Sequence, residues 1–387
     1  MAVQKSRGAG GGVASIQRHF AELTDPRRRS GAVIHPLINI VAMTVVGVLC
    51  GADDFVAIAR FAQNKKDWFA KFLDLSNGIP SHDRINVVLA GIKPDEFEKC
   101  FLSWITALQQ ATQGKVIAVD GKTLRGSFDR ADEKSAIHMV SAWSAEHQLS
   151  LGQLRTQAKS NEITAIPKLL EMLEIAGCFV TIDAMGCQTE IARKIVEAGG
   201  DYCLAVKDNQ PTLHQGIVAA FSEWMEADFA DVRVSRHLTS ETAHGRHDHR
   251  TYLVCPIPAD LPDRDRWPGI KAIGVSLTKS TNVLSGKVSE GHMRYYILSK
   301  YISAKRFGGM VRGHWNIENQ LHWQLDVAFR EDHSRVRTGH ADENLSRVRR
   351  LALALLKHDK TAKLGVKNKR LCAGWDDDYR TKVLLGQ

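Results

Sequence analysis

The stretch Val116–Ser127, VIAVDGKTLRGS, joins a short apolar run to a charged segment that contains glycine. Its β-branched residues favour a strand over Val116–Asp120, and the Gly-Lys pair that follows predicts a turn. The carboxylate of Asp120 is therefore expected at the end of a strand, at the edge of a sheet. Ligands bind at the carboxyl edge of open α/β sheets, which makes Asp120 a candidate site residue.

A second stretch, Cys178–Gly186, has the same form, since CFVTIDAMG runs apolar and then presents Asp183. The segments 137–144 and 149–156 read as strands, 162–173 and 189–198 as helices, and 202–207 as a further strand. Three consecutive strands followed by alternation with helices predict a mixed sheet with helices on its faces. This α/β order matches a ribonuclease-H-like arrangement, in which the first and fourth strands are parallel neighbours.

The composition indicates a folded protein of two or three domains, with 44% hydrophobic and 25% charged residues among 387. Lysine and arginine number 52 against 43 acidic residues, and the resulting net charge of +9 favours a polyanionic partner. The seven cysteines contain no CxxC pair, so the sequence predicts neither a disulfide framework nor a thiolate zinc site. The apolar segment Leu37–Cys50 is too short to span a membrane, and no secretory signal is evident. We expect a cytoplasmic protein without a membrane partner.

The region before the sheet is predicted to be a helical domain over 16–112, after a flexible, glycine-rich segment 1–15. Leu37–Cys50 reads as a buried core helix. Asp53 and Asp54 can cap a helix over 53–74, Ser81 can cap one through Leu89, and Pro94–Gln110 reads as another. The cluster Arg27–Arg29 is interpreted either as a phosphate contact or as a solvated loop.

The region after a helix at Leu213–Glu226 changes to strand-like segments at 232–239, 250–255, 270–278 and 293–298. They predict a β-rich insertion over 229–301, which divides a catalytic core formed by 113–228 and 302–360. His244–Arg250, HGRHDHR, is interpreted as a basic hairpin and not as a zinc motif. Trp267 can pack or stack on a base, packing being favoured. Helices are expected at 304–329 and 343–358, and the basic tail 361–387 is expected to be peripheral.

Two carboxylates at neighbouring strand ends have a chemical consequence. At about 4 Å and an effective dielectric near 20, they repel by roughly 4 kcal/mol, so the pair needs a proton or a cation. Hard oxygen ligands favour Mg²⁺, with Mn²⁺ as a substitute. The bland alternative is that both aspartates merely end strands in turns.

A third carboxylate, Glu318, flanks an apolar helical stripe in VRGHWNIENQLHWQLDVAFRED, Val311–Asp332. A glutamate at the rim of the core can lean over the sheet edge. Three such acids can hold two metal ions that activate a water or a 3′-hydroxyl and stabilise the leaving oxygen at phosphorus. If Glu318 is not the third acid, Asp326 and Glu331 are the nearest substitutes.

The segments VIAVDGKTLRGS, VTIDAMGCQ, AVKDNQ and RGHWNIENQLHWQLDVAFRED, in this order, resemble the DDE transposases of bacterial insertion sequences, in the group that includes the H-repeat-associated proteins. The resemblance extends to the start HFAELTDPRR and covers nearly the whole chain. It implies a ribonuclease-H-like catalytic core with the acidic triad Asp120, Asp183 and Glu318. It also implies double-stranded DNA as the partner, at the element ends and at the target, and a homodimer in the synaptic complex.

The candidate DNA contacts surround this triad. Lys122 and Arg125 follow Asp120, and Lys207 ends the strand before AVKDNQ. Related transposases with such an insertion often carry a basic residue on each side of the glutamate, where this chain has His314 and Leu325. Arg312 is expected to take over the first role, and His314 and His322 either contact DNA or pack.

Three functions remain open at this point. The favoured one is a transposase that binds the terminal inverted repeats of its element, cleaves DNA and joins the freed 3′-hydroxyl to a target. A nuclease on the same core would cleave without joining. A DNA-binding relic would no longer catalyse, although the presence of all three acids argues against it.

Overall fold

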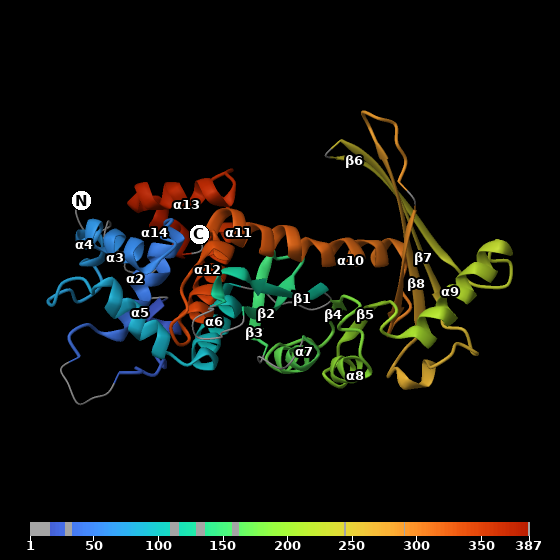
Figure 1. Cartoon of the computed structure of the whole chain (residues 1–387), viewed down its shortest axis with the longest axis horizontal. Helices are drawn as coiled ribbons and strands as arrows, with labels where there is room; N and C mark the ends of the chain where they lie inside the picture. Colours follow the sequence, from blue (N-terminus) through green and yellow to red (C-terminus); the bar gives the residue numbers. More distant parts are fainter. Residues whose placement is uncertain are drawn as a thin grey trace, which may run out of the picture.

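A mixed β-sheet runs through the centre of the computed structural model of this chain, which describes residues 16–27, 33–108, 116–128, 136–156, 162–243, 245–289 and 291–385 (Figure 1). In these residues the strand order is β3-β2-β1-β4-β5-β9-β8-β7-β6. The strands are β1 Val116–Leu124, β2 Ile137–Ser144, β3 Leu149–Arg155, β4 Phe179–Ile182, β5 Asp201–Val206, β6 Ser235–Ala243, β7 Arg246–Pro256, β8 Ala272–Asn282 and β9 His292–Leu298.

The first five strands follow the predicted order. β1, β2 and β3 form an antiparallel meander, and β1 then pairs in parallel with β4, which pairs in parallel with β5. The prediction that the first and fourth strands are parallel neighbours is therefore confirmed. β9 pairs antiparallel with β5, so the β-rich segment continues the same sheet and does not form a separate one.

The predicted turn after Asp120 is wrong. β1 continues through Gly121 and Lys122 to Leu124, and Asp120 pairs with Ser141 of β2. A Cβ atom on residue 121 would lie 2.0 Å from Oε1 of Glu162 and 2.4 Å from Nε2 of His138. The glycine is there because other side chains come close to the strand, and not because the chain turns.

Helices cover both faces of the sheet. α7 Glu162–Glu171, α8 Thr189–Glu197 and α9 Pro211–Glu226 share one hydrophobic cluster with the strands, through residues such as Ile166, Ile191 and Phe221. α10 Ala304–Ile317 lies across the opposite face and reaches from β1 to the strands of the insertion (Figure 1). A π-helical turn, Glu318–His322, connects α10 to α11 Trp323–Phe329.

The strands β6, β7 and β8 form a long arm that extends away from the rest of the molecule (Figure 1). The HGRHDHR segment lies at its first hairpin; His244 is outside the described residues, and Arg246–Arg250 belong to β7. Arg250 forms ion pairs with Glu241 and Asp248. Trp267 is only 2% exposed, which confirms packing as its role. A short 3₁₀ turn, Arg264–Arg266, precedes it.

The N-terminal helices are α2 Leu37–Leu49, α3 Phe55–Asn64, α4 Lys66–Phe69, α5 His82–Gly91 and α6 Pro94–Leu108. Two predicted caps are confirmed: the carboxylate of Asp54 accepts the N–H of Ala57 at 2.8 Å, and the hydroxyl of Ser81 accepts the N–H of Arg84 at 3.2 Å. The helix predicted over 53–74 is instead divided at Lys65 into α3 and α4. Of the cluster Arg27–Arg29, only Arg27 lies within the described residues, where it pairs with Asp25.

The C-terminal helices are α12 Ala341–His358, α13 Val366–Trp375 and α14 Asp377–Leu385. The prediction of a peripheral tail is wrong, because α13 and α14 share a hydrophobic core with α2 and α12. Arg370 is 4% exposed and donates to the carbonyl of Val48 at 2.7 Å. Arg380 is fully buried, with its guanidinium 4.2 Å from the ring of Trp68. Arg370 and Arg380 therefore serve packing within the protein.

None of the helices within the described residues is long and apolar enough to cross a membrane.

Candidate active site

Asp120 and Asp183 occupy neighbouring positions at one edge of the parallel strand pair. The last parallel partners are Val119 of β1 and Ile182 of β4, and each aspartate is the next residue in the chain. The backbone N–H of Gly186 donates to Oδ1 of Asp183 at 3.3 Å. The sequence predicted that both carboxylates lie at the same edge of the sheet, and the pairing of β1 with β4 agrees, although β1 itself continues past Asp120.

The electrostatics of Asp120 indicate a site with an excess of negative charge. Burial raises the pKa of Asp120 to about 7, and the nearby carboxylates of Glu162, Asp183 and Glu318 raise it as well, against a hydrogen bond from the N–H of Gly121. Burial also raises the pKa of Asp183, as does Glu162, whereas Lys207 opposes the rise. A proton or a cation would relieve this repulsion.

Glu318 is the first residue of the π-helical turn, and its side chain is exposed. Its charge contributes to the raised pKa of Asp120, so the turn brings Glu318 into electrostatic range of that aspartate. π-helical turns recur at functional sites, where they redirect side chains out of the regular helical spacing. The two residues that could replace Glu318 as the third acid, Asp326 and Glu331, instead form ion pairs with Lys122.

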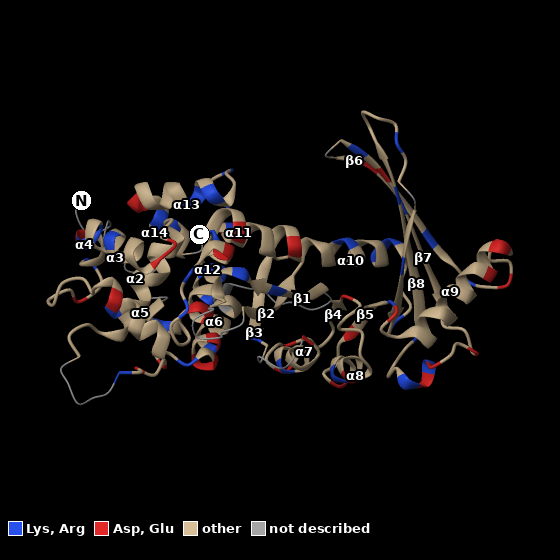
Figure 2. Cartoon of the chain, in the orientation of Figure 1, with Lys and Arg blue, Asp and Glu red and all other residues tan. Residues whose placement is uncertain are grey.

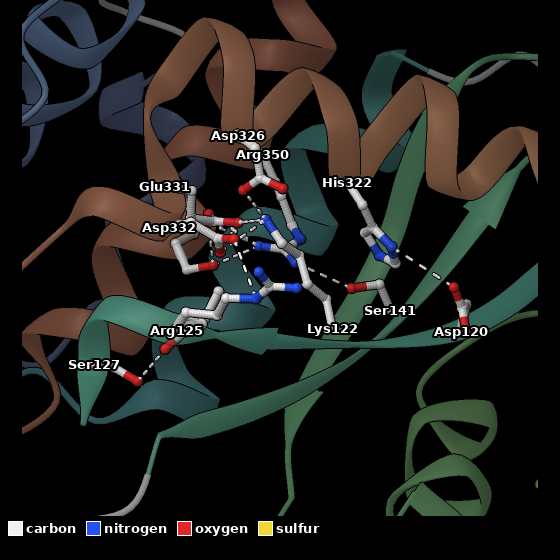
Figure 3. A network of polar contacts seen from close by, with 12 residues as sticks. Asp120, Lys122, Arg125, Ser127, Ser141, His322, Asp326, Glu331, Asp332 and Arg350 are labelled. Atoms are coloured by element: carbon white, nitrogen blue, oxygen red, sulfur yellow. Dashed lines mark hydrogen bonds and ion pairs between the residues drawn. The ribbon is translucent and has the colours of Figure 1, made fainter.

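His322, four residues after Glu318, lies beside Asp120. Its Nδ1 is 3.6 Å from Oδ2 of Asp120, and Figure 3 shows the ring pointing toward that carboxylate. Burial lowers the pKa of His322 to about 3, and Arg350 and Lys122 contribute to the lowering. The imidazole is therefore neutral at physiological pH and adds no positive charge to the site.

Oxygen ligands dominate the donor set at this edge. Asp120, Asp183 and Glu318 supply carboxylates, the ligands that Mg²⁺ prefers. As the side chains stand, the described residues contain no group of three or more His, Cys, Asp or Glu that could hold a metal ion. Two features still fit a divalent cation. The donors are carboxylate oxygens, and a bound cation would offset the repulsion that helps to raise the pKa of Asp120.

Lys122 lies in a buried ion-pair cluster and not on a surface that a phosphate could reach. Its side chain is 8% exposed, and its Nζ contacts the carboxylates of Asp326, Glu331 and Asp332, at 3.0 Å for Glu331 and 3.7 Å for Asp332 (Figure 3). Burial alone would raise the pKa of Glu331, but Lys122 and neighbouring arginines, chiefly Arg350, lower it to about 2. This cluster joins β1 to α11 and to the 3₁₀ turn Glu331–His333.

Two of the predicted DNA contacts, Arg125 and Lys207, are exposed on the surface. Arg125, in the 3₁₀ turn Arg125–Ser127, is 82% exposed, with Nε 3.7 Å from the carboxylate of Asp332. Lys207 is exposed directly after β5 and lines a cavity of about 190 Å³ that also includes Asp183. Both have charge available for phosphate.

The predicted contacts on α10 have partners within the protein. Arg312 donates to Glu241 of the arm at 2.7 Å, although its side chain is still 46% exposed. His314 lies against Thr181, with Nδ1 3.1 Å from Oγ1, and burial lowers its pKa to about 4. His314 is therefore neutral. α10 connects β4, at Thr181, to the arm.

Sequence reasoning missed Glu162, the first residue of α7. Its Oε1 is 2.6 Å from Nε2 of His138 on β2, and its charge raises the pKa of both Asp120 and Asp183. Its signal in the sequence is its position, as the first residue of the helix predicted after the third strand. No motif marks it, because the residues that surround it come from three separate segments.

Comparison with known proteins places this chain in a family. Residues 111–355 match the family described as Transposase DDE domain, and residues 17–105 match the one described as DDE_Tnp_1-associated. The match covers most of the chain and includes all three predicted acids. The chain therefore belongs to the DDE transposase domain family.

Several relatives align with nearly the full length of this chain. "Putative transposase YncI" of Escherichia coli O157:H7 is 43% identical over 96% of this chain and 95% of its own length. "H repeat-associated putative transposase YhhI" of Escherichia coli K12 is 39% identical over 96% of this chain and 98% of its own length. "Putative protein YbfL" of the same strain shows the same identity and coverage. The predicted resemblance to the H-repeat-associated group is confirmed.

A solved structure described as a piggyBac transposase synaptic complex with hairpin DNA aligns with 98% of this chain and 83% of its own, at 8% identity and a TM-score of 0.40. Similarity of this size supports no inference about the present chain.

Proposed function

We propose that this protein is a transposase that cleaves DNA at the terminal inverted repeats of its insertion sequence and joins the freed 3′-hydroxyl to a target. Membership in the DDE transposase domain family supports the reaction class. The observation that carries the proposal is the pairing of β1 with β4, which places Asp120 and Asp183 side by side, together with the carboxylate of Glu318 near Asp120.

We propose that Asp120, Asp183 and Glu318 bind two Mg²⁺ ions, which Mn²⁺ can replace. Such ions, when bound, activate a water or a 3′-hydroxyl and stabilise the leaving oxygen at phosphorus. Asp120 and Asp183 come from neighbouring strands of the central sheet, so the scaffold fixes their separation. Glu318 comes from the π-helical turn whose last residue, His322, lies beside Asp120. Neutral His322 fills the space beside Asp120 without competing for its charge.

We propose that different regions of the chain have different roles in catalysis, DNA binding and structural support. We propose a ribonuclease-H-like core of β3-β2-β1-β4-β5 with α7, α8 and α10, formed by 113–228 and 302–360. The β-rich insertion 229–301 and the N-terminal helical region 16–112 would grip the element ends. The described part of the C-terminal region, 361–385, packs on the N-terminal helices, so it supports that part of the protein.

Duplex DNA is the proposed partner, in keeping with the net charge of +9. Arg125 and Lys207 are exposed cations of the proposed core, and Arg312 lies on α10. Lysines and arginines also lie along α10 and on the strands of the arm (Figure 2). We propose that His314 and His322 support the site from within the protein, that two copies pair in the synaptic complex, and that the protein acts on DNA in the cytoplasm.

A strand-transfer assay tests this function. Purified protein is incubated with labelled DNA that carries the terminal repeats, a supercoiled target plasmid and Mg²⁺. A transposase produces labelled plasmid in which the 3′ end of the element is joined to the target. Cleavage without any joined product would instead identify a nuclease, and binding without either reaction would identify a relic. Short direct duplications flanking the inverted repeats in the genome would support the transposase independently.

A further inference from the structure

The π-helical turn Glu318–His322 sets how α11 is rotated relative to α10. The backbone N–H of Trp323 donates to the carbonyl of Glu318, five residues earlier, which is the π-helical pattern. Such a turn contains one residue more than an α-helical turn, so its collapse would change the rotation between the two helices by about 100°. The place of His322 beside Asp120, with Nδ1 3.6 Å from Oδ2, therefore depends on the turn (Figure 3).

Lys357 of α12 holds this turn by a side-chain hydrogen bond. Its Nζ donates to Oε1 of Gln320, the middle residue of the turn, at 2.7 Å. An amine can donate to an amide oxygen whether or not it carries the extra proton, so the contact persists in both protonation states. The two residues are 37 positions apart, and the bond gives the turn an anchor in a neighbouring helix.

The same amine lies against the central sheet. Nζ of Lys357 is 4.9 Å from the centre of the Trp143 ring, which is 1% exposed. In the register of β1 and β2, Trp143 is opposite Ala118, two residues before Asp120. Trp143 and Ala118 belong to the same hydrophobic cluster as Leu321 of the turn. Lys357 therefore connects α12, β2 and the π-helical turn next to the strand that carries Asp120.

Lys357 has no acidic partner among the described residues. Arg350, on the same helix, forms an ion pair with the buried carboxylate of Glu331. Lys357 is half-buried, and burial lowers its pKa to about 7, with a further contribution from Lys360. A cation buried without a counter-charge destabilises the fold, so a role in positioning the turn accounts for Lys357 better than a role in stability.

We propose that Lys357 is a positioning residue of the active site, which holds the π-helical turn over β1 through Gln320. The fixed turn sets where Glu318 and His322 lie relative to Asp120. This inference rests on the proposed function, because it requires that the turn contributes to DNA cleavage. The amine itself contacts none of the reacting groups, and its effect passes through the backbone of the turn.

Hydrogen exchange followed by mass spectrometry tests the structural part of the proposal without any reaction. Lys357→Met keeps much of the aliphatic side chain over Trp143 but cannot donate to Gln320. We expect the amides of residues 318–323 to exchange at least about tenfold faster in this variant, while the sheet exchanges as in wild type. Lys360→Met is the matched control, because Lys360 is exposed and donates to a backbone carbonyl, and it should leave exchange in the turn unchanged.

Single-turnover cleavage of labelled element ends with Mg²⁺ tests the functional part. Lys357→Met should lower the cleavage rate by about 10- to 100-fold, as a small displacement of catalytic groups does, and should leave DNA affinity unchanged. Gln320→Leu, which removes the acceptor, should have the same effect. The double variant should be no slower than either single variant, because both substitutions remove the same contact. A general loss of structure would instead weaken DNA binding as well.

Wild-type exchange in the turn, or wild-type cleavage by folded Lys357→Met, would overturn the role of Lys357. The proposed function would stand in that case if wild type cleaves DNA and Glu318→Gln does not. Failure of the wild type to cleave would contradict the proposed function, and with it the catalytic part of this inference. If Lys357→Met fails to fold, Gln320→Leu replaces it in both assays, and wild-type values there would contradict the proposal.

Discussion

Lys122 offers the most quantitative test of how this site is held together. Replacing it with methionine keeps much of the buried aliphatic stem but removes the ammonium that contacts Asp326, Glu331 and Asp332. The side chain of Glu331 is fully buried, and its pKa is lowered from 4.5 to about 2 by cations of which Lys122 is the strongest. At about 1.4 kcal/mol per pH unit, this lowering is worth about 3 kcal/mol of folding free energy. Breaking a buried ion pair on one side costs about 3–5 kcal/mol, which agrees.

The pH dependence follows from the direction of the pKa shift. The folded pKa of Glu331 lies below its unfolded value, so the stabilisation is fully present above about pH 4.5 and is lost as the pH falls toward 2. In Lys122→Met the folded pKa of Glu331 moves back toward its usual value. The stability gap between wild type and variant should therefore be largest at neutral pH and should shrink in acid.

Urea unfolding followed by tryptophan fluorescence, at about pH 7 and about pH 3, measures both effects. Arg125→Met is the matched control, because Arg125 approaches the same Asp332 at 3.7 Å but is 82% exposed. A screened surface pair of this kind contributes at most about 1 kcal/mol. A loss below about 1 kcal/mol for Lys122→Met, or a gap that does not change with pH, would refute the assignment of Lys122 to a buried structural cluster.

Three further predictions concern the site and its scaffold. Gly121→Ala should lower Mg²⁺-dependent cleavage by about 100-fold, because the added methyl displaces Glu162 and His138. Gly309→Ala should be neutral in the same assay, because the space around Gly309 is open. Mn²⁺ binding should weaken by about tenfold per pH unit below about pH 7, because Asp120 with its raised pKa then binds a proton that the metal must displace. Above about pH 7 the Mn²⁺ affinity should level off. A Mn²⁺ affinity that does not change between about pH 5.5 and about pH 8 would contradict this prediction. Trp267→Ala should cost about 3–5 kcal/mol in thermal or urea unfolding while leaving DNA affinity of the folded protein unchanged, since its ring is buried.

The local sequence determined much of the fold. The helix caps at Asp54 and Ser81 and the strand over 137–144 depend on residues close together in the chain, whereas the pairing of β1 with β4 followed from the order of the predicted strands and helices. The two aspartates could be predicted for the same reason, because each directly follows a run of β-branched residues. Glu318 could be suggested from its place beside the apolar stripe of its helix, but Asp326 and Glu331 were alternatives, and the resemblance to a family favoured Glu318.

The contacts between distant segments could not be predicted in this way. Lys122 looked like a phosphate ligand because its partners Asp326 and Glu331 lie about two hundred positions further on. Arg370 and Arg380 looked like solvated tail residues because the core that buries them is formed mainly by N-terminal helices. Gly121 looked like a turn because a single sequence does not show whether a glycine bends the chain or makes room for a neighbour.

DNA cleavage by single-residue variants is the most direct test of the central claim that Asp120, Asp183 and Glu318 form one metal-dependent site. Wild type, Asp120→Asn, Asp183→Asn and Glu318→Gln are compared on labelled element ends with Mg²⁺, and DNA binding is measured in parallel. The account predicts that each variant binds the ends as wild type does but has lost cleavage. Wild-type cleavage by any one of the three would remove that residue from the site, and wild-type cleavage by Asp120→Asn would contradict the account as a whole.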